Sequence, residues 1–288
     1  MIPFLKYKKI YFTLSGLLIL ASLVSLILFG LKPGIDFTGG SILEIRYQEN
    51  RPSNEEIREA LSDLDLGEVK IQPSSEKRVI LRIKDISEEV HQQMIERLEG
   101  SEELRFETIG PVIGREMEQK TKVVAILAVL AILLYITIAF RKVSRPIPSW
   151  QYGIAALIAL GHDIFIPLGV FAYLGHFYGI QITIPIITAL LTILGYSINN
   201  TVVVFDRVRE NLTINKSSSF KEIVDKSLNQ TLARSINTSL TTLLVLFAIF
   251  FLGGETLKYF ALALIIGLIC GTYSSIFLAS PLLAAKST

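Results

Sequence analysis

Long apolar runs recur along most of this 288-residue chain, and short polar segments separate them. About 20 apolar residues, at 1.5 Å per helical residue, cross the roughly 30 Å hydrocarbon layer of a bilayer. The pattern therefore predicts a polytopic α-helical membrane protein with six transmembrane helices. The predicted spans lie at residues 1–31, 121–140, 151–174, 182–206, 232–252 and 257–281.

The first run could instead be a secretory signal peptide, because Lys6, Lys8 and Lys9 precede it. Its apolar part, Ile10 to Gly30, has 21 residues, which is longer than a usual signal core, and no small-x-small cleavage site follows. A retained first span is the preferred interpretation.

Residues 32–120 form the one block in which apolar and polar residues alternate as they do in a soluble domain. Ser53 with Glu56 has the spacing of a helix capping box, and Ser87 precedes a second acidic helix start. The elements alternate as β-α-β-β-α-β, which predicts a small α+β ferredoxin-like domain between helices 1 and 2. The predicted elements are 42–47, 53–64, 69–72, 79–84, 87–100 and 104–109.

The net charge of this domain is opposite in sign to that of the rest of the chain. Residues 31–120 hold 13 Lys and Arg against 20 Asp and Glu, a net charge of −7, whereas the rest of the chain carries +9. The loop 175–181 has no Lys or Arg, and basic residues follow the second and fourth spans, which places those loops in the cytosol. Both termini are then cytosolic and the domain is extracytosolic. The basic loop residues are Arg141, Lys142, Arg145, Arg207, Arg209, Lys216, Lys221 and Lys226.

The remaining residues, 121–288, are predicted to form a five-helix membrane region. Its cytosolic connector near 212–230 is predicted to be an amphipathic helix that lies on the inner surface of the membrane. Composition agrees, since 51% of residues are hydrophobic and the mean hydropathy is +0.51. The single cysteine, Cys270, allows no intramolecular disulfide. No metal-ligand cluster is evident, so we expect no cofactor, no enzymatic site and no nucleic-acid partner.

Polar residues inside the spans are the candidate functional residues, because such groups are costly in hydrocarbon. Asn199 and Asn200 interrupt the fourth span, and Arg234 lies at similar depth in the fifth, which predicts that they are neighbours. Asp163, beside His162 in the third span, is a candidate ion site or the counter-charge of Arg234. Alternatively, Arg234 extends to the cytosolic headgroups and Asp163 is structural.

Small residues recur every four positions in the sixth span and give one smooth helix face. That face allows another helix to approach closely, either within this bundle or from a separate membrane subunit. The residues are Ala263, Gly267, Gly271, Ser275 and Ala279.

The heptad Gly34-Ile35-Asp36-Phe37-Thr38-Gly39-Gly40, just after the first span, resembles the signature of the SecF family of protein-export subunits. Four further stretches, 161–163, 196–211, 231–244 and 271–283, resemble the corresponding spans of that family. Physically, the glycines of the heptad suit a tight, extended exit from the membrane.

The resemblance implies a halved fold of the resistance-nodulation-division type in the bacterial inner membrane, paired with a SecD-like subunit. It further implies work beside the SecYEG channel and YajC, with a proton or sodium gradient driving the export of unfolded polypeptide. In the family pattern an acid stands at the position of Asn200, and Arg234 matches the family arginine. An amide cannot titrate, which leaves Asp163 or a carboxylate of the partner as the possible ion carrier. Two alternatives remain, namely a half-size efflux-type transporter subunit and a membrane scaffold without ion coupling.

Overall fold

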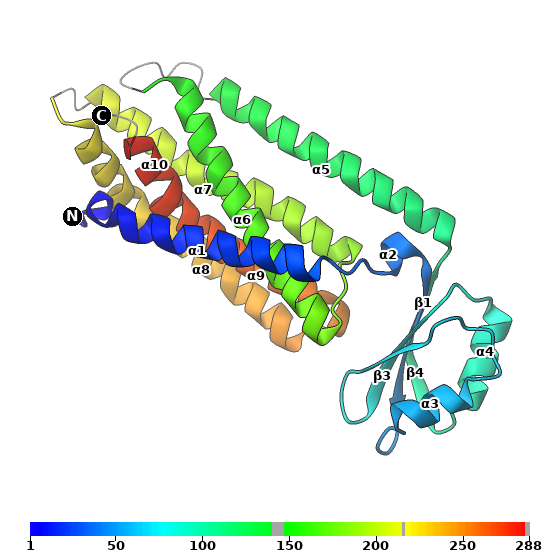
Figure 1. Ribbon diagram of the computed structural model, residues 1–288. Helices are drawn as coiled ribbons and strands as arrows, with labels where there is room; N and C mark the ends of the chain where they lie inside the picture. The colour runs from blue at the N-terminus through cyan, green and yellow to red at the C-terminus, as the bar shows by residue number, and fades with distance from the viewer. Residues whose placement is uncertain (140–146, 215–216, 286–288) are drawn as a thin grey trace. The chain divides into compact units, whose positions relative to one another are not determined.

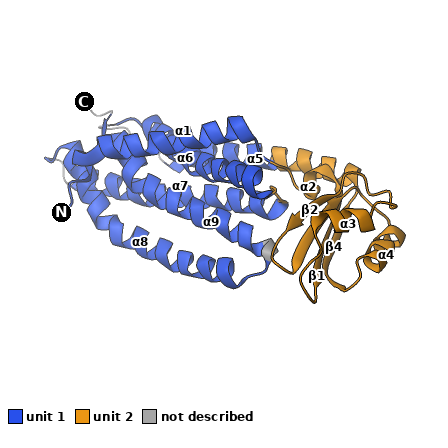
Figure 2. Cartoon of the chain, turned by 60° about the horizontal axis from the view of Figure 1, so that its bottom comes forward, with its two compact units in different colours: residues 1–31, 124–180, 184–288 blue, residues 32–123, 181–183 orange. Residues whose placement is uncertain are grey.

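The structure is a computed structural model that describes residues 1–139, 147–214 and 217–285. It contains two compact units (Figure 2). Unit 1 comprises Met1–Leu31, Val124–Ile180 and Ile184–Thr288, and unit 2 comprises Lys32–Val123 with Gln181–Thr183. The chain thus passes from unit 1 to unit 2 after Leu31, returns inside one long helix at residues 123–124, and enters unit 2 again for the segment Gln181–Thr183.

Unit 1 is a bundle of long helices (Figure 1). Six helical stretches among the described residues are long and apolar enough to cross a membrane, as predicted. The helices are α1 (Lys8–Phe29), α5 (Pro111–Ala139), α6 (Ser149–Tyr178), α7 (Ile184–Ile214), α8 (Phe220–Leu252), α9 (Glu255–Ser274) and α10 (Ser280–Ala285), with a π-helical segment, Ser275–Ala279, joining the last two.

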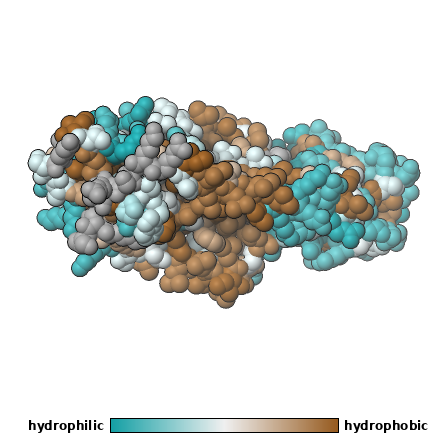
Figure 3. Space-filling view, turned by 90° about the horizontal axis from the view of Figure 1, so that it is seen from above, coloured by the Kyte–Doolittle hydropathy of each residue, from teal (hydrophilic) through white to brown (hydrophobic). Residues whose placement is uncertain are grey.

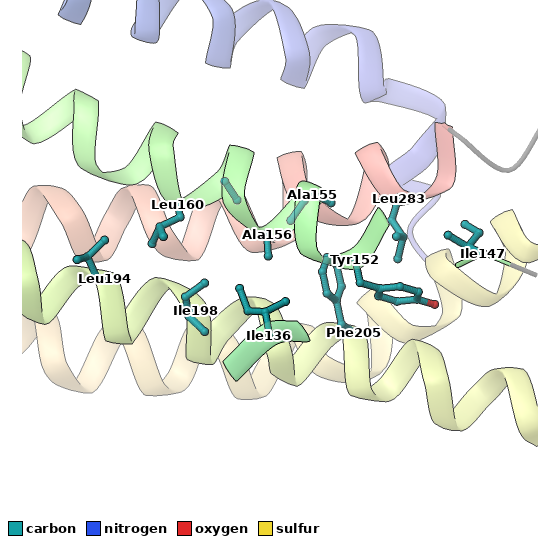
Figure 4. Packing of buried hydrophobic residues seen from close by; sticks show 12 residues of the cluster. Ile136, Ile147, Tyr152, Ala155, Ala156, Leu160, Leu194, Ile198, Phe205 and Leu283 are labelled. Atoms are coloured by element: carbon teal, nitrogen blue, oxygen red, sulfur yellow. The ribbon is translucent and has the colours of Figure 1, made fainter. Parts of the chain in front are cut away.

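The bundle core is built where α6 meets α7 and the end of the chain. Tyr152 and Phe205 are fully buried and pack edge to face, with ring centroids 5.3 Å apart (Figure 4). Ala155, Ala156 and Ala159 let the neighbouring helices approach α6 closely. The surface of the bundle carries broad apolar areas, whereas unit 2 is mainly hydrophilic (Figure 3). This contrast fits a bilayer around unit 1 and water around unit 2.

The connector near 212–230 differs from its prediction. Helix α7 continues to Ile214, and α8 begins at Phe220 after a capping box formed by Ser219 and Glu222. The apolar residues expected in a surface helix, Ile223, Val224 and Leu228, lie instead in the first turns of α8. There they are buried in one cluster with Val204, Val208, Phe4 and Ile276. The expected separate surface helix is therefore wrong, because its apolar face finds protein partners. Arg141, Lys142, Arg145 and Lys216 lie outside the described residues.

Unit 2 holds one four-stranded antiparallel sheet in the order β2-β3-β1-β4. Alternate side chains such as Leu43, Ile45 and Leu81 are fully buried, and they pack with Ile57 and Met94 from two helices on the same face. The elements are α2 (Ile35–Thr38), β1 (Gly40–Tyr47), α3 (Asn54–Ala60), β2 (Lys70–Pro73), β3 (Arg78–Ile83), α4 (Glu88–Arg97) and β4 (Ser101–Ile109).

The predicted start of α3 is confirmed, since Ser53 and Glu56 form both hydrogen bonds of the capping box. Its predicted end at residue 64 is wrong. The helix stops at Ala60, where the hydroxyl of Ser62 donates to the carbonyl of Glu59 at 2.7 Å. A side chain that satisfies a terminal carbonyl competes with helix continuation.

The prediction that the heptad 34–40 leaves the membrane as an extended segment is wrong. Residues Ile35–Thr38 form one helical turn, and Gly39 and Gly40 follow with φ of 75° and 121°. The amide of Gly34 donates to the carbonyl of Ile182 at 2.7 Å. A Cβ on Gly39 would lie 2.7 Å from the Cα of Pro111, so only glycine fits there.

Candidate functional site

Asp163 lies in α6 with no solvent exposure in this chain. The preceding residue, His162, is 1% exposed, and its Nδ1 is 2.9 Å from Asp163 Oδ1. A carboxyl group this deep in an apolar bundle requires hydrogen-bond donors, because its charged form is otherwise very costly. The helices beside α6 supply them.

Two serine hydroxyls donate to the same carboxylate oxygen. Ser197 of α7 lies 2.5 Å from Asp163 Oδ2, and Ser274 of α9 lies 2.6 Å from it. The three helices α6, α7 and α9 therefore meet at one carboxyl group. Neither serine was identified as a site residue from the sequence, although Ser197 lies within the Tyr196–Asn200 stretch and Ser274 directly precedes Ser275 of the small-residue stripe.

His162 extends this site toward α1. Its ring stacks on Tyr273 at 5.8 Å between centroids, and the hydroxyl of Tyr273 donates to the carbonyl of Tyr11 at 3.1 Å. The second ring nitrogen of His162, Nε2, is buried without a hydrogen-bond partner among the described residues. An imidazole between a carboxyl group and an unpartnered position can hold or pass a proton.

The two asparagines of α7 are not equivalent. Asn200 is 4% exposed, and its Nδ2 has no partner among the described residues, whereas Asn199 is exposed. Among the residues that the structure describes, neither amide forms a hydrogen bond with Arg234, which is exposed on α8. In the described part of the chain, Arg234 makes no hydrogen bond or ion pair with Asp163 either. Among the described residues, no hydrogen bond or ion pair therefore links Arg234 to Asn199, Asn200 or Asp163.

Polar residues of α8 lie on two faces of the helix. Ser235 and Ser239 are buried, and Ser239 links Tyr196 of α7 at 3.2 Å with Thr272 of α9 at 2.6 Å. Three further polar residues of α8 are exposed on the surface of the chain, as Arg234 is. They are Asn237, Thr238 and Thr241.

The small-residue stripe of the last span packs inside this bundle. A Cβ on Gly267 would overlap the side chain of Ile193 in α7, and one on Gly271 would lie 3.4 Å from Ser197 and 3.5 Å from Asp163 Oδ2. Ser275 is fully buried. Of the two alternatives left open by the sequence, close packing within the chain is the one observed, and it brings Ser274 to the carboxyl group.

Among the described residues, no group of three or more His, Cys, Asp or Glu side chains is placed to hold a metal ion. The arrangement offers instead one carboxyl group, one imidazole and several hydroxyls inside a bundle. Such groups exchange a proton or bind a small cation through oxygen.

Two family models match parts of the chain. Residues 89–288 match the family described as "Protein export membrane protein SecD/SecF, C-terminal", and residues 24–50 match the "SecD/SecF GG Motif". The chain is 42% identical to the protein translocase subunit SecF of Thermobaculum terrenum, over 99% of this chain and 94% of that protein. It is 38% identical to SecF of Vibrio alginolyticus, over 98% of this chain and 88% of that protein.

A solved structure is also similar. The crystal structure of SecDF, a translocon-associated membrane protein from Thermus thermophilus, superposes with a TM-score of 0.84 at 35% identity. The match covers 98% of this chain but only 38% of that longer chain. Two family models match the chain, relatives align with it over nearly their full length, and a solved structure shares its fold. The chain therefore belongs to the SecF family of protein translocase subunits.

Proposed function

We propose that this chain is an accessory subunit of the Sec protein translocase, which works with a SecD-like subunit to promote the export of unfolded polypeptide with an ion gradient. It lies in the bacterial cytoplasmic membrane with cytosolic termini, and unit 2 is its ferredoxin-like extracytosolic domain. The observation that carries the ion-coupling role is the buried carboxyl group of Asp163, which faces two serine hydroxyls and an imidazole.

Asp163 suits this role because it is the only acid of the described spans that lies fully buried among three helices. The position that carries an acid in the family pattern is Asn200 here, and an amide does not titrate. A proton on Asp163 neutralises the carboxyl group and weakens its charge-assisted bonds to α7 and α9. Protonation would thereby change how tightly three helices are held together.

The exposed polar face of α8 favours the interpretation that this chain contacts a partner subunit in the membrane. Arg234 and Asn199 project from the chain at a depth where a cation in lipid is costly. A carboxylate on a helix of the SecD-like subunit would neutralise Arg234. In this assembly the chain supplies one titrating acid and the partner supplies another.

The test is proton-gradient-stimulated export in vesicles that contain the Sec channel, the SecD-like subunit and variants of this chain. We expect Asp163→Asn to abolish the stimulation, Arg234→Ala to reduce it, and Asn200→Asp to alter its dependence on pH. The matched control is Asp206→Asn, since Asp206 is an exposed acid of α7 that pairs with Arg209 at 2.9 Å. Equal stimulation by the unaltered chain and Asp163→Asn would show that coupling belongs to the partner.

One observation favours a second candidate, an uncoupled scaffold. The buried amide at Asn200 replaces a titratable group, so the family site cannot work here as it does with an acid. A scaffold would assemble with its partner and raise export to the same extent with and without a gradient. Asn200→Asp would then be the one variant that gains a dependence on the gradient.

A further inference from the structure

The sheet of unit 2 has one face without helices, and cations are concentrated on it. Helices α3 and α4 cover the face that bears Leu43 and Leu81. The strand positions between those buried residues point to the opposite face. Its side chains from β1, β2 and β3 are Ile42, Glu44, Arg46, Lys70, Gln72, Arg78, Ile80 and Arg82.

Like charges stand directly opposite each other at two places on this face. The pairing register sets Arg46 of β1 against Arg78 of β3, and it sets Lys70 of β2 against Arg82 of β3. Like charges directly opposite in antiparallel strands destabilise the sheet. Between these two cationic rows lies Ile80, with Gln72 on one side and Glu44, which is 7% exposed, on the other.

Neighbouring acids neutralise this face only in part. Arg46 of β1 pairs with Glu102 of β4 at 2.6 Å, and within β4 Arg105 pairs with Glu107 at 2.5 Å. At the other edge, Lys70 lies 3.6 Å from Glu68. Arg78 has no acidic partner among the described residues. The surplus of positive charge is therefore greatest along β3.

This local surplus is opposite in sign to the rest of the domain, because residues 31–120 carry a net charge of −7. A domain with that net charge is repelled from an anionic membrane surface. The cationic face is suited instead to a smaller acidic partner, because such a partner contacts this face alone and stays away from the acidic remainder of the domain.

We propose that this face is a docking surface for an extended polypeptide segment with two acidic side chains at positions i and i+4 and an apolar one at i+2. Arg78 and Arg82 are four residues apart on β3, or about 13 Å at 3.3 Å per residue. An extended segment along β3 has the same repeat, so its two acids meet the two arginines and its central apolar side chain meets Ile80. The inference rests on the proposed export function for its biological meaning, since the segment would belong to polypeptide outside the membrane.

The proposal is tested by binding in solution, without export. The full chain in nanodiscs of neutral lipid is titrated with a fluorescent peptide in which Glu-Thr-Leu-Thr-Glu is flanked by threonine and valine. The comparison peptides are Lys-Thr-Leu-Thr-Lys in the same flanks and a version with the two glutamates adjacent. We expect only the first to bind, and its affinity to fall as salt is raised.

The matched variants are the double change Arg78→Thr with Arg82→Thr on the face, and the control Arg58→Gln at an exposed position of helix α3. The double variant should bind the peptide between about twofold and thirtyfold more weakly, because exposed ion pairs contribute modestly. Its melting temperature should change little, because the removal of two like-charge contacts offsets the loss of the hydrogen bond that Arg82 donates to Gln72. Loss of binding together with an intact melt is thus specific to the face.

Three results would overturn the proposal. They are unchanged binding by the double variant, equal binding of the lysine peptide, and binding of vesicles of anionic lipid that the double variant loses while the peptide never binds. The last result would assign the face to a membrane surface. Export assays are not part of this test, so it can fail while the proposed export function stands, and the reverse also holds.

Discussion

At the scale of single residues, the site depends on hydroxyl groups that lie on different helices from the acid. Ser197 and Ser274 hold Asp163 Oδ2 from α7 and α9 at 2.5 and 2.6 Å. Such interhelical bonds in membranes average about 0.6 kcal/mol and reach about 1.7 kcal/mol. Their geometric effect is larger than their energy, because they bring one carboxyl oxygen between three helices.

The first prediction concerns Ser197→Ala. We expect it to destabilise the protein in detergent by about 0.6 to 1.7 kcal/mol, because Asp163 loses an interhelical donor. The measurement is thermal unfolding of the purified chain. The control is Ser22→Ala, whose hydroxyl donates at 2.8 Å to Leu18 of its own helix. If the two variants lose the same stability, the bond to Asp163 has no special weight.

A second residue-scale prediction concerns Gly267. Leucine at this position would overlap Ile193, so Gly267→Leu should separate α9 from α7 and cost about 1–3 kcal/mol or more. Adding Ile193→Ala should restore part of the melting temperature by making room. Gly16→Leu serves as the control, since no atom lies within 4 Å of its added Cβ. An unchanged melt for Gly267→Leu would mean that the two helices do not pack closely there.

At the scale of elements, the turn between α2 and β1 requires glycine for two separable reasons. Gly39 has φ of 75°, and a Cβ there would lie 2.7 Å from Pro111 Cα. Gly100, before β4, has φ of 73° but no atom within 4 Å of an added Cβ. The pair separates backbone strain from steric overlap.

We therefore predict that Gly100→Ala costs about 1–2 kcal/mol from strain alone. Gly39→Ala should cost about 1–3 kcal/mol more, because overlap adds to the strain. Denaturant unfolding of unit 2 measures both. Equal losses would show that Pro111 moves away without cost.

The start of α3 makes a prediction about acid. Hydrogen bonds from the backbone and side chain of Ser53 hold the pKa of Glu56 below its usual value. A lowered pKa in the folded state stabilises above the unfolded value of about 4.3, and this contribution is lost as pH falls through the folded value. Glu56→Gln should therefore lose less stability than the unaltered protein between about pH 5 and pH 3. Glu55→Gln, one residue earlier on the same exposed turn, should follow the unaltered protein; if it matches Glu56→Gln instead, the capping box is not the cause.

At the scale of the whole molecule, the two units have separate hydrophobic cores. The core of unit 2 takes all its members from residues 43–106, and unit 1 has its own clusters around α6, α7 and α8. Unit 2 should therefore fold without the bundle.

We predict that residues 32–123, expressed alone, unfold cooperatively on heating. Circular dichroism should show helix and strand together, with one sigmoidal melt. The fragment lacks Ile182, so the amide of Gly34 loses its carbonyl partner, and some loss of stability is expected. A gradual melt with a random-coil spectrum would contradict the independence of the domain.

Sequence patterns alone were enough to predict the number of apolar helices, the position of the α+β segment and the family resemblance. These features depend on local properties, namely run length, period-two alternation, capping residues such as Ser53 and the heptad 34–40. The sequence also identified Asp163 and Asn200 as polar residues inside spans. Helix ends were less well predicted, because α7 and α8 extend beyond their apolar cores to Ile214 and back to Phe220.

Which of the polar residues contact one another depends on the packing of the helices and became evident only from the three-dimensional fold. Equal depth suggested Arg234 as the neighbour of Asn200, but depth does not determine how a helix is rotated about its axis. That rotation follows from packing between helices far apart in sequence, such as Gly267 against Ile193. Packing turned Ser197 and Ser274 toward Asp163 and left Arg234 on the outer surface. For the same reason the cationic face of the sheet emerges only from strand register, which sets residues 46 and 78 side by side although 32 positions separate them.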